Sequence, residues 1–251
     1  MQALLARLLA EPRLLDAVAA DPESYAKRYR LTTAEVTSLI GSASPGLIFS
    51  VELTRWKNFR DVDGALPGTL ALCRAVVADD EIFTQCLAGT RTFSLQGVVD
   101  TADRLGALAV RHAAAADVPV IEDMVRFESA LQRVGRRPRA PAEVSAQGPA
   151  LDPRGEVLAF GCAVNGIRRR LTAGTAYEEL RGQRTYCLVV PGKAGKGRTL
   201  VLRVSAGMYE LLRMCDGSMP TDALAKRLGV SAGSVANALA YVQSKGVELT
   251  A

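Results

Sequence analysis

Apolar residues recur at helical spacing through most of the first half of the chain. In the opening segment they fall three or four residues apart, at Leu4, Leu5, Leu8, Leu9 and Leu15, and this pattern predicts an amphipathic helix. The helix is expected to end near Asp21-Pro22, because a proline disfavours the helical conformation of the residue before it. Thr32 and Glu35 form a capping-box pattern ahead of the next helix. Further helices are predicted over 68–78, 79–88, 95–114 and 118–134.

Two segments of this half are predicted to lie between helices. Ser44-Pro45-Gly46 is expected to break the chain, since proline and glycine are the strongest local helix breakers. The Trp-Lys-Asn-Phe segment at 56–59 is expected in a connection. The first half is therefore predicted to be all-α.

From residue 156 the pattern is typical of strands. Short apolar runs occupy 157–162 and 167–171, and two more at 186–190 and 199–204 flank a Gly- and Lys-rich segment that predicts a hairpin. Three helices are then expected: one ending at the Asp216-Gly217 turn, one over 220–228, and one capped by Ser231. Strands followed by three helices, the last two joined by a tight turn, are the arrangement of a winged helix-turn-helix. The predicted fold class is α+β.

The amino-acid composition and the absence of known motifs argue against several classes of function. The chain has 251 residues, five cysteines without a CxxC pair, and one histidine, His112. A chain with one histidine does not build a His-rich iron, copper or zinc centre by itself. No phosphate-binding, dinucleotide-binding or nucleophile-elbow motif occurs in the sequence. No stretch approaches the roughly 18 uncharged apolar residues of a membrane span, so we expect a cytoplasmic protein with no catalytic residues, no bound metal or cofactor and no membrane contact.

Charge divides the chain into two halves. Residues 1–135 have 14 Lys and Arg against 17 Asp and Glu, a net charge of −3, whereas residues 136–251 have 17 against 9, a net charge of +8. A segment rich in Pro, Gly and small residues follows at 136–155 and predicts a surface linker. We therefore expect a helical domain at 1–135 and a winged-helix domain at 156–251.

The basic second half makes a DNA-binding transcriptional regulator the alternative function. The predicted recognition helix argues against it, because its N-terminal end presents Ala232, Gly233 and Ser234, and Lys245 is its only basic residue. A helix in the major groove normally offers Arg, Lys, Asn or Gln to the base edges near this end. Asn237 is the one candidate reader, so nucleic acid is not the expected partner. The regulator hypothesis would place duplex contacts on Arg168–Arg170 or the Lys193/Lys196 tip.

Residues 200–229 read Leu-Val-Leu-Arg-Val-Ser-Ala-Gly-Met-Tyr-Glu-Leu-Leu-Arg-Met-Cys-Asp-Gly, then Ser-Met-Pro, then Thr-Asp-Ala-Leu-Ala-Lys-Arg-Leu-Gly. They resemble the PqqD-like family of precursor-peptide recognition elements. The resemblance implies that the leader of a ribosomally made peptide binds as an additional strand beside 199–204, against the last helix, in the manner of strand addition at an open sheet edge. The peptide-binding residues it implies are Arg198, Leu200, Val201, Arg203, Val235, Leu239 and Val242.

The first half resembles the N-terminal part of the partner proteins of multinuclear non-heme iron-dependent oxidative enzymes. The similar stretches are residues 21–32 and the helix at 118–133, which is similar to the family's Asp-x-x-Arg-x-Glu-x-Ala-Leu pattern. Within that family it is most similar to the partner in 3-thiaglutamate biosynthesis. The resemblance implies a heterodimer in which the iron belongs to the other subunit. Aromatic and Arg residues dominate interface energetics, and the enzyme-docking residues expected are Arg55, Trp56, Phe59 and Arg126.

Together these features predict a non-catalytic partner subunit. It would bind a ribosomal precursor peptide and present the peptide's cysteine to an iron-dependent oxidase. For several of these residues a purely structural role is the alternative. Trp56 would then be core, Arg126 and Glu128 a solvated helix face or an internal ion pair, and Arg168–Arg170 a solvated face. Cys187 and Cys215 lie in apolar contexts and are expected in the core.

Overall fold

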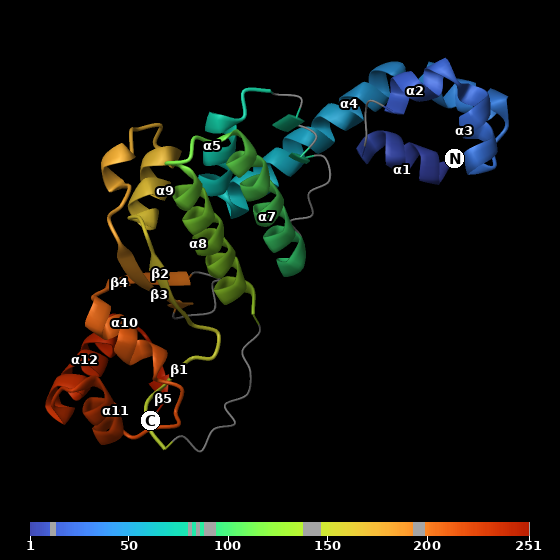
Figure 1. Ribbon diagram of the computed structural model, residues 1–251. Helices are drawn as coiled ribbons and strands as arrows, with labels where there is room; N and C mark the ends of the chain where they lie inside the picture. The colour runs from blue at the N-terminus through green and yellow to red at the C-terminus, as the bar shows by residue number, and fades with distance from the viewer. Residues whose placement is uncertain are drawn as a thin grey trace. The chain divides into compact units, whose positions relative to one another are not determined.

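In the computed structural model (Figure 1), a mostly helical N-terminal part is followed by a small three-stranded antiparallel sheet with helices, so the predicted α+β class is confirmed. The structure describes residues 1–10, 14–79, 82–83, 86–87, 94–137, 147–192 and 199–250. The chain divides into two compact units, Met1–His112 and Ala113–Ala251. No helix within the described residues is long and apolar enough to cross a membrane.

The first unit is built from helices only, within its described residues. They are α1 (Gln2–Ala10), α2 (Leu14–Ala20), α3 (Pro22–Tyr29), α4 (Thr33–Ala65), α5 (Pro67–Val76) and α7 (Leu95–His112). The first three helices pack on the beginning of α4 around a core that includes Leu4, Leu8, Val18 and Val36. The capping box is confirmed, since Glu35 N–H donates to Thr32 Oγ1 and Thr32 N–H donates to Glu35 Oε2. The predicted helix at 79–88 lies partly outside the described residues.

The predicted chain break at 44–46 is wrong, because α4 continues as one helix from Thr33 to Ala65. A proline inside a helix costs about 3 kcal/mol relative to alanine, and tertiary packing at the two ends of α4 offsets this. Val36 is buried against α1 and α2 at one end, and Val62 and Leu66 are buried at the other. The Trp-Lys-Asn-Phe segment is therefore helical rather than a connection.

The second unit contains the sheet. Its strands are β2 (Glu156–Phe160), β3 (Thr185–Pro191) and β4 (Thr199–Val204), in the order β2-β3-β4 and antiparallel throughout. The predicted hairpin of β3 and β4 is confirmed, with Leu188 opposite Leu202 and Cys187 opposite Arg203. A second small sheet pairs β1 (Ala150–Leu151) with β5 (Leu249–Thr250).

The two faces of the main sheet are covered by different helices. Side chains alternate between the faces along a strand, so Leu188 and Val190 of β3 share one face with Leu200, Leu202 and Val204 of β4. This face packs on α10 (Ala206–Arg213) and α12 (Ala232–Ser244) through a core that contains Leu212, Val242 and Val247. The opposite face, with Phe160, is covered by α8 (Val118–Arg136), whose Phe127 ring meets the Phe160 ring edge to face at 5.8 Å.

The position of α8 was not expected from its sequence. We predicted its residues as part of a helical domain at 1–135, whereas α8 packs on β2, β3 and β4 and belongs to the second unit. Val120, Ile121, Met124 and Phe127 are all buried, and the Phe127 ring lies against Phe160 of β2. The sheet is therefore a middle layer between α8 on one side and the C-terminal helices on the other.

The remaining elements of the second unit include one further correction. The predicted strand-like run at 167–171 lies in a helix, α9 (Val164–Thr172), followed by a 3-10 turn, η1 (Glu178–Leu180). Val164 and Ile167 are both fully buried and lie three residues apart, a helical rather than a strand spacing. The last three helices are close to the prediction, with α11 at Thr221–Leu228, Ser205 and Ser231 as N-caps of α10 and α12, and Gly229 as a left-handed C-cap.

Candidate functional site

Strand β4 forms an open edge of the sheet. It pairs with β3 on one side, and no described strand pairs with it on the other. In an edge strand every second residue directs its N–H and C=O groups away from the sheet, where another extended chain can bind to them. Thr199, Val201 and Arg203 lie on the face covered by α8, and Leu200 and Leu202 on the face covered by α10 and α12.

A cleft of about 430 Å³ lies beside this edge on the α8 face. Nine residues from three elements line it: Phe127, Leu131, Gln132, Gly135 and Arg136 of α8, Asn165 and Arg168 of α9, and Thr199 and Val201 of β4. We call it the α8–β4 cleft. Five of the nine residues have polar side chains, and two of these are arginines.

An apolar hollow of about 300 Å³ lies among α10, α11 and α12. Ser205, the residue that follows β4, lines it together with Met208, Leu211, Val230, Val235 and Ala238. Val230 is 47% exposed. The edge strand thus lies near two hollows of opposite character.

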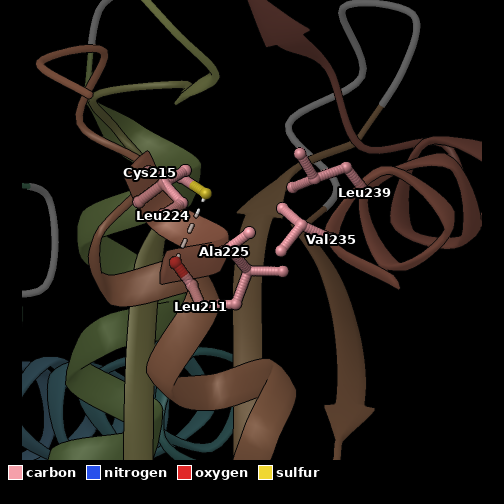
Figure 2. Packing of buried hydrophobic residues seen from close by; sticks show 6 residues of the cluster. All are labelled: Leu211, Cys215, Leu224, Ala225, Val235 and Leu239. Carbon is pink, nitrogen blue, oxygen red and sulfur yellow. Dashed lines mark hydrogen bonds between the residues drawn. The ribbon is translucent and has the colours of Figure 1, made fainter. Parts of the chain in front are cut away.

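The predicted peptide-binding residues do not all lie on one surface. Val235, Leu239 and Val242 are buried, and the first two belong to a core that includes Leu211 and Leu224 (Figure 2). Their side chains hold the helices together, and only Val235 also lines the apolar hollow.

The strand residues of this prediction lie on both faces of the sheet. Leu200 packs against the core, Val201 lines the α8–β4 cleft, and Arg203 is exposed on the same face as Val201. Arg198 lies outside the described residues. Gln132, Arg136 and Asn165 were not predicted, because they come near β4 only when α8 and α9 pack on the sheet.

Helix α8, which resembles the partner-protein pattern, is held on the rest of the second unit by several of its polar side chains. Asp123, which is 7% exposed, accepts hydrogen bonds from the backbone N–H of Gly161 at 2.7 Å and of Cys162 at 3.3 Å. Arg126 donates to Asp123 at 3.3 Å and to the Ala159 carbonyl at 3.3 Å. Arg126, predicted to dock the enzyme, therefore makes contacts within its own unit, although its side chain is 55% exposed.

Two ion pairs strengthen this attachment. Glu128 is completely buried on α8, and Arg168 Nε of α9 donates to its Oε1 at 2.8 Å. Arg133 binds Glu156 of β2 with two hydrogen bonds of 2.7 Å, the bidentate geometry that makes such pairs strong. Glu128 thus pairs with Arg168 of α9, whereas Arg126 pairs with Asp123 of its own helix.

The Arg168–Arg170 run is only partly a solvated face. Arg168 pairs with Glu128, and Arg170 donates to the Ala176 carbonyl at 2.8 Å and pairs with Glu179. Arg169 is exposed. Arg168 and Arg170 therefore have a structural role, because their contacts hold α9 to neighbouring segments.

A second candidate surface lies on α4 in the first unit. Phe49, Leu53 and Trp56 are 68%, 52% and 57% exposed, and their spacing of four and three residues places them on one side of the helix. We call these three residues the α4 stripe. The guanidinium of Arg60 lies 4.7 Å from the centre of the Trp56 ring, a cation–π contact. Trp56 is therefore a surface residue and not part of the core.

Of the other predicted docking residues, Phe59 is half-buried, with Arg74 5.9 Å from its ring centre. Arg55 lies on α4, but its side chain is outside the described part of the chain. Phe49 and Leu53 were missed because no helix was predicted between the expected break at 44–46 and residue 68, and Trp56 was placed in a connection. One continuous helical pattern through 49–56 would have revealed the stripe.

The buried cysteines are confirmed as core residues at positions 187 and 215. Burial raises the pKa of both thiols to about 11, and Cys215 Sγ donates to the Leu211 carbonyl at 3.3 Å (Figure 2). Burial raises the pKa of Cys73 and Cys162 to about 12, and at Cys162 the nearby Asp123 charge acts in the same direction. A thiol with a raised pKa is a poor nucleophile near neutral pH, because the thiolate is the reactive form.

We therefore expect Cys86, which is half-buried, to react with a thiol reagent at pH 8 before the other four cysteines. Denatured protein should show five equally reactive thiols. Folding raises the pKa of the four buried thiols above the value of about 9 that they have in the unfolded chain. Their contribution to the free energy of unfolding is therefore fully present below about pH 9 and is lost as the pH rises towards 12. Mass spectrometry of alkylated peptides at successive times measures the order, and rapid labelling of Cys162 in the native protein would contradict the prediction.

No group of three or more His, Cys, Asp or Glu side chains suited to a metal ion occurs in the part of the chain that the structure describes. No protein-family model matches the chain, and no curated protein matches it.

Proposed function

We propose that this chain is a non-catalytic partner subunit that binds a ribosomally made precursor peptide and presents it to an iron-dependent oxidase. The observation that supports it best is the open edge of β4 with the α8–β4 cleft on one face and the apolar hollow near its end. An extended peptide added to such an edge gains affinity from backbone hydrogen bonds and specificity from pockets for alternate side chains.

The order of elements after β2 supports a winged helix-turn-helix of the PqqD-like kind. The hairpin of β3 and β4 is followed by α10, α11 and α12, and the stretch that resembles this family covers β4, α10 and α11. In such an arrangement the last helix lies beside the strand that receives the peptide. The exposed side of α12 has small residues such as Ala236 and Ala240, which leave room for an added strand.

The α4 stripe supports the second half of the proposal. Large exposed apolar side chains gathered on one helix are typical of protein interaction surfaces, and a Trp with a stacked Arg is a frequent energetic centre of an interface. We propose that the oxidase docks here, as a heterodimer, and that its iron performs the chemistry. The partner subunit would act by raising the effective concentration of the peptide's cysteine and by orienting it.

Binding of a peptide at β4 predicts a specific pattern of amide protection. The probe is a set of peptides selected for binding to the whole protein from a displayed library of random sequences. On addition of a selected peptide, the outward-directed amides of β4 (199–204) should exchange with deuterium more slowly, because each gains a backbone partner. Strand β2, the other edge of the sheet, is the internal control and should keep its exchange rates.

Protection confined to other elements would contradict strand addition at β4. Selection of no peptide above background, together with salt-dependent binding of a DNA duplex, would instead favour the regulator hypothesis, since phosphate contacts weaken with added salt.

A further inference from the structure

The α8–β4 cleft lies where side chains of an added strand would enter. Along the new strand, every second side chain would point to the α8 face, on the side of Thr199, Val201 and Arg203. Thr199 and Val201 also line the cleft. Side chains of the peptide on this face therefore lie over the cleft, and those on the other face lie towards α12.

The charge of this face is positive. Arg136 and Arg168 line the cleft, and Arg203 is exposed two residues beyond Val201. Glu128 pairs with Arg168 and offsets its charge, so the positive charge of this face comes from Arg136 and Arg203.

The cleft also contains hydrogen-bond donors from three side chains. Arg168 uses Nε for Glu128 and its side chain remains 30% exposed, and a guanidinium has five N–H donors. The amides of Gln132 and Asn165 line the same space. Carboxylates are the groups that such a set of donors binds most strongly.

We propose that the α8–β4 cleft is a subsite for acidic side chains of the bound peptide, placed at alternate positions of its strand. This inference rests on the proposed function, because the cleft acts only on a chain added at β4. It assigns to α8 a part in peptide selection in addition to its packing on the sheet.

The test compares peptides selected from one random displayed library by the wild-type protein and by the variant Arg136→Glu. The matched control is Arg169→Glu, which reverses an exposed charge on α9 next to Arg168 but outside the cleft. Wild type and control should select peptides with Asp or Glu spaced two residues apart. Arg136→Glu should lose this preference or select Lys and Arg there, and it should bind the wild-type peptides at least about tenfold more weakly.

Three outcomes decide the matter. The pattern above, with unchanged far-ultraviolet circular dichroism of Arg136→Glu, supports the subsite. Equal acidic preference in wild type and Arg136→Glu overturns the subsite and leaves peptide binding at β4 standing. Failure of the wild-type protein to select any peptide overturns both this inference and the proposed function.

Discussion

Replacing Arg168 by alanine is expected to lower the free energy of unfolding by about 3 kcal/mol, because it takes the positively charged partner of this ion pair away from a buried carboxylate. Glu128 is 0% exposed, and the 2.8 Å bond from Arg168 joins two elements 40 residues apart in sequence. Loss of this bond removes one of the attachments of α8 to the second unit.

Urea unfolding of the whole protein, followed by far-ultraviolet circular dichroism, measures this effect. Trp56 lies in the first unit, so its fluorescence does not report on α8, and amide exchange of β3 (185–191) serves as the reporter of the second unit. The matched control is Arg169→Ala, an exposed neighbour expected to change stability by no more than about 0.5 kcal/mol.

A double variant distinguishes the buried charge from lost packing. Adding Glu128→Gln to Arg168→Ala should restore part of the stability, since it removes the uncompensated charge. Equal stability of the Arg168→Ala and Arg169→Ala proteins would show that the pair does not hold α8 in place.

Replacing Trp56 by alanine or Leu53 by aspartate is expected to weaken docking of the proposed oxidase by about a hundredfold or more, the effect of losing a residue at the energetic centre of an interface. Both side chains are more than half exposed, so neither substitution removes core packing from the free protein. Leu53→Asp also introduces a charge that would have to be desolvated in the complex.

Co-expression of the tagged chain with its neighbouring genes, followed by quantitative mass spectrometry of what co-purifies, measures docking. The control is Asp61→Ala, an exposed position on another side of α4. Co-purification of an iron-containing protein with the wild type and the control, but not with the two variants, is the expected result. Equal recovery from all four proteins would place the docking surface elsewhere, and conversion of a wild-type dimer into a monomer by both variants would assign the stripe to self-association.

The sequence by itself determined the local features of the structure. The capping box of Thr32 and Glu35, the serine caps at Ser205 and Ser231, and the hairpin of β3 and β4 are as predicted. Each of these features depends on residues that lie close together in the sequence. The residues that cause it can therefore be recognised within one short stretch of the chain. The α+β order of elements follows from the same local patterns.

The tertiary structure decided the features that depend on distant residues. Pro45 does not end α4 because both ends of this helix pack on other elements, and 167–171 is helical because α9 buries Val164 and Ile167.

Glu128 and Arg168 look like surface charges in the sequence, yet they pair with each other across 40 residues. Arg126 likewise donates to the Ala159 carbonyl, 33 residues away. The α8–β4 cleft exists only because α8 covers the sheet and brings Gln132 and Arg136 to the edge strand. A single sequence holds no signal for contacts of this range, because apolar residues that pack within one domain and those that pack on the next have the same spacing.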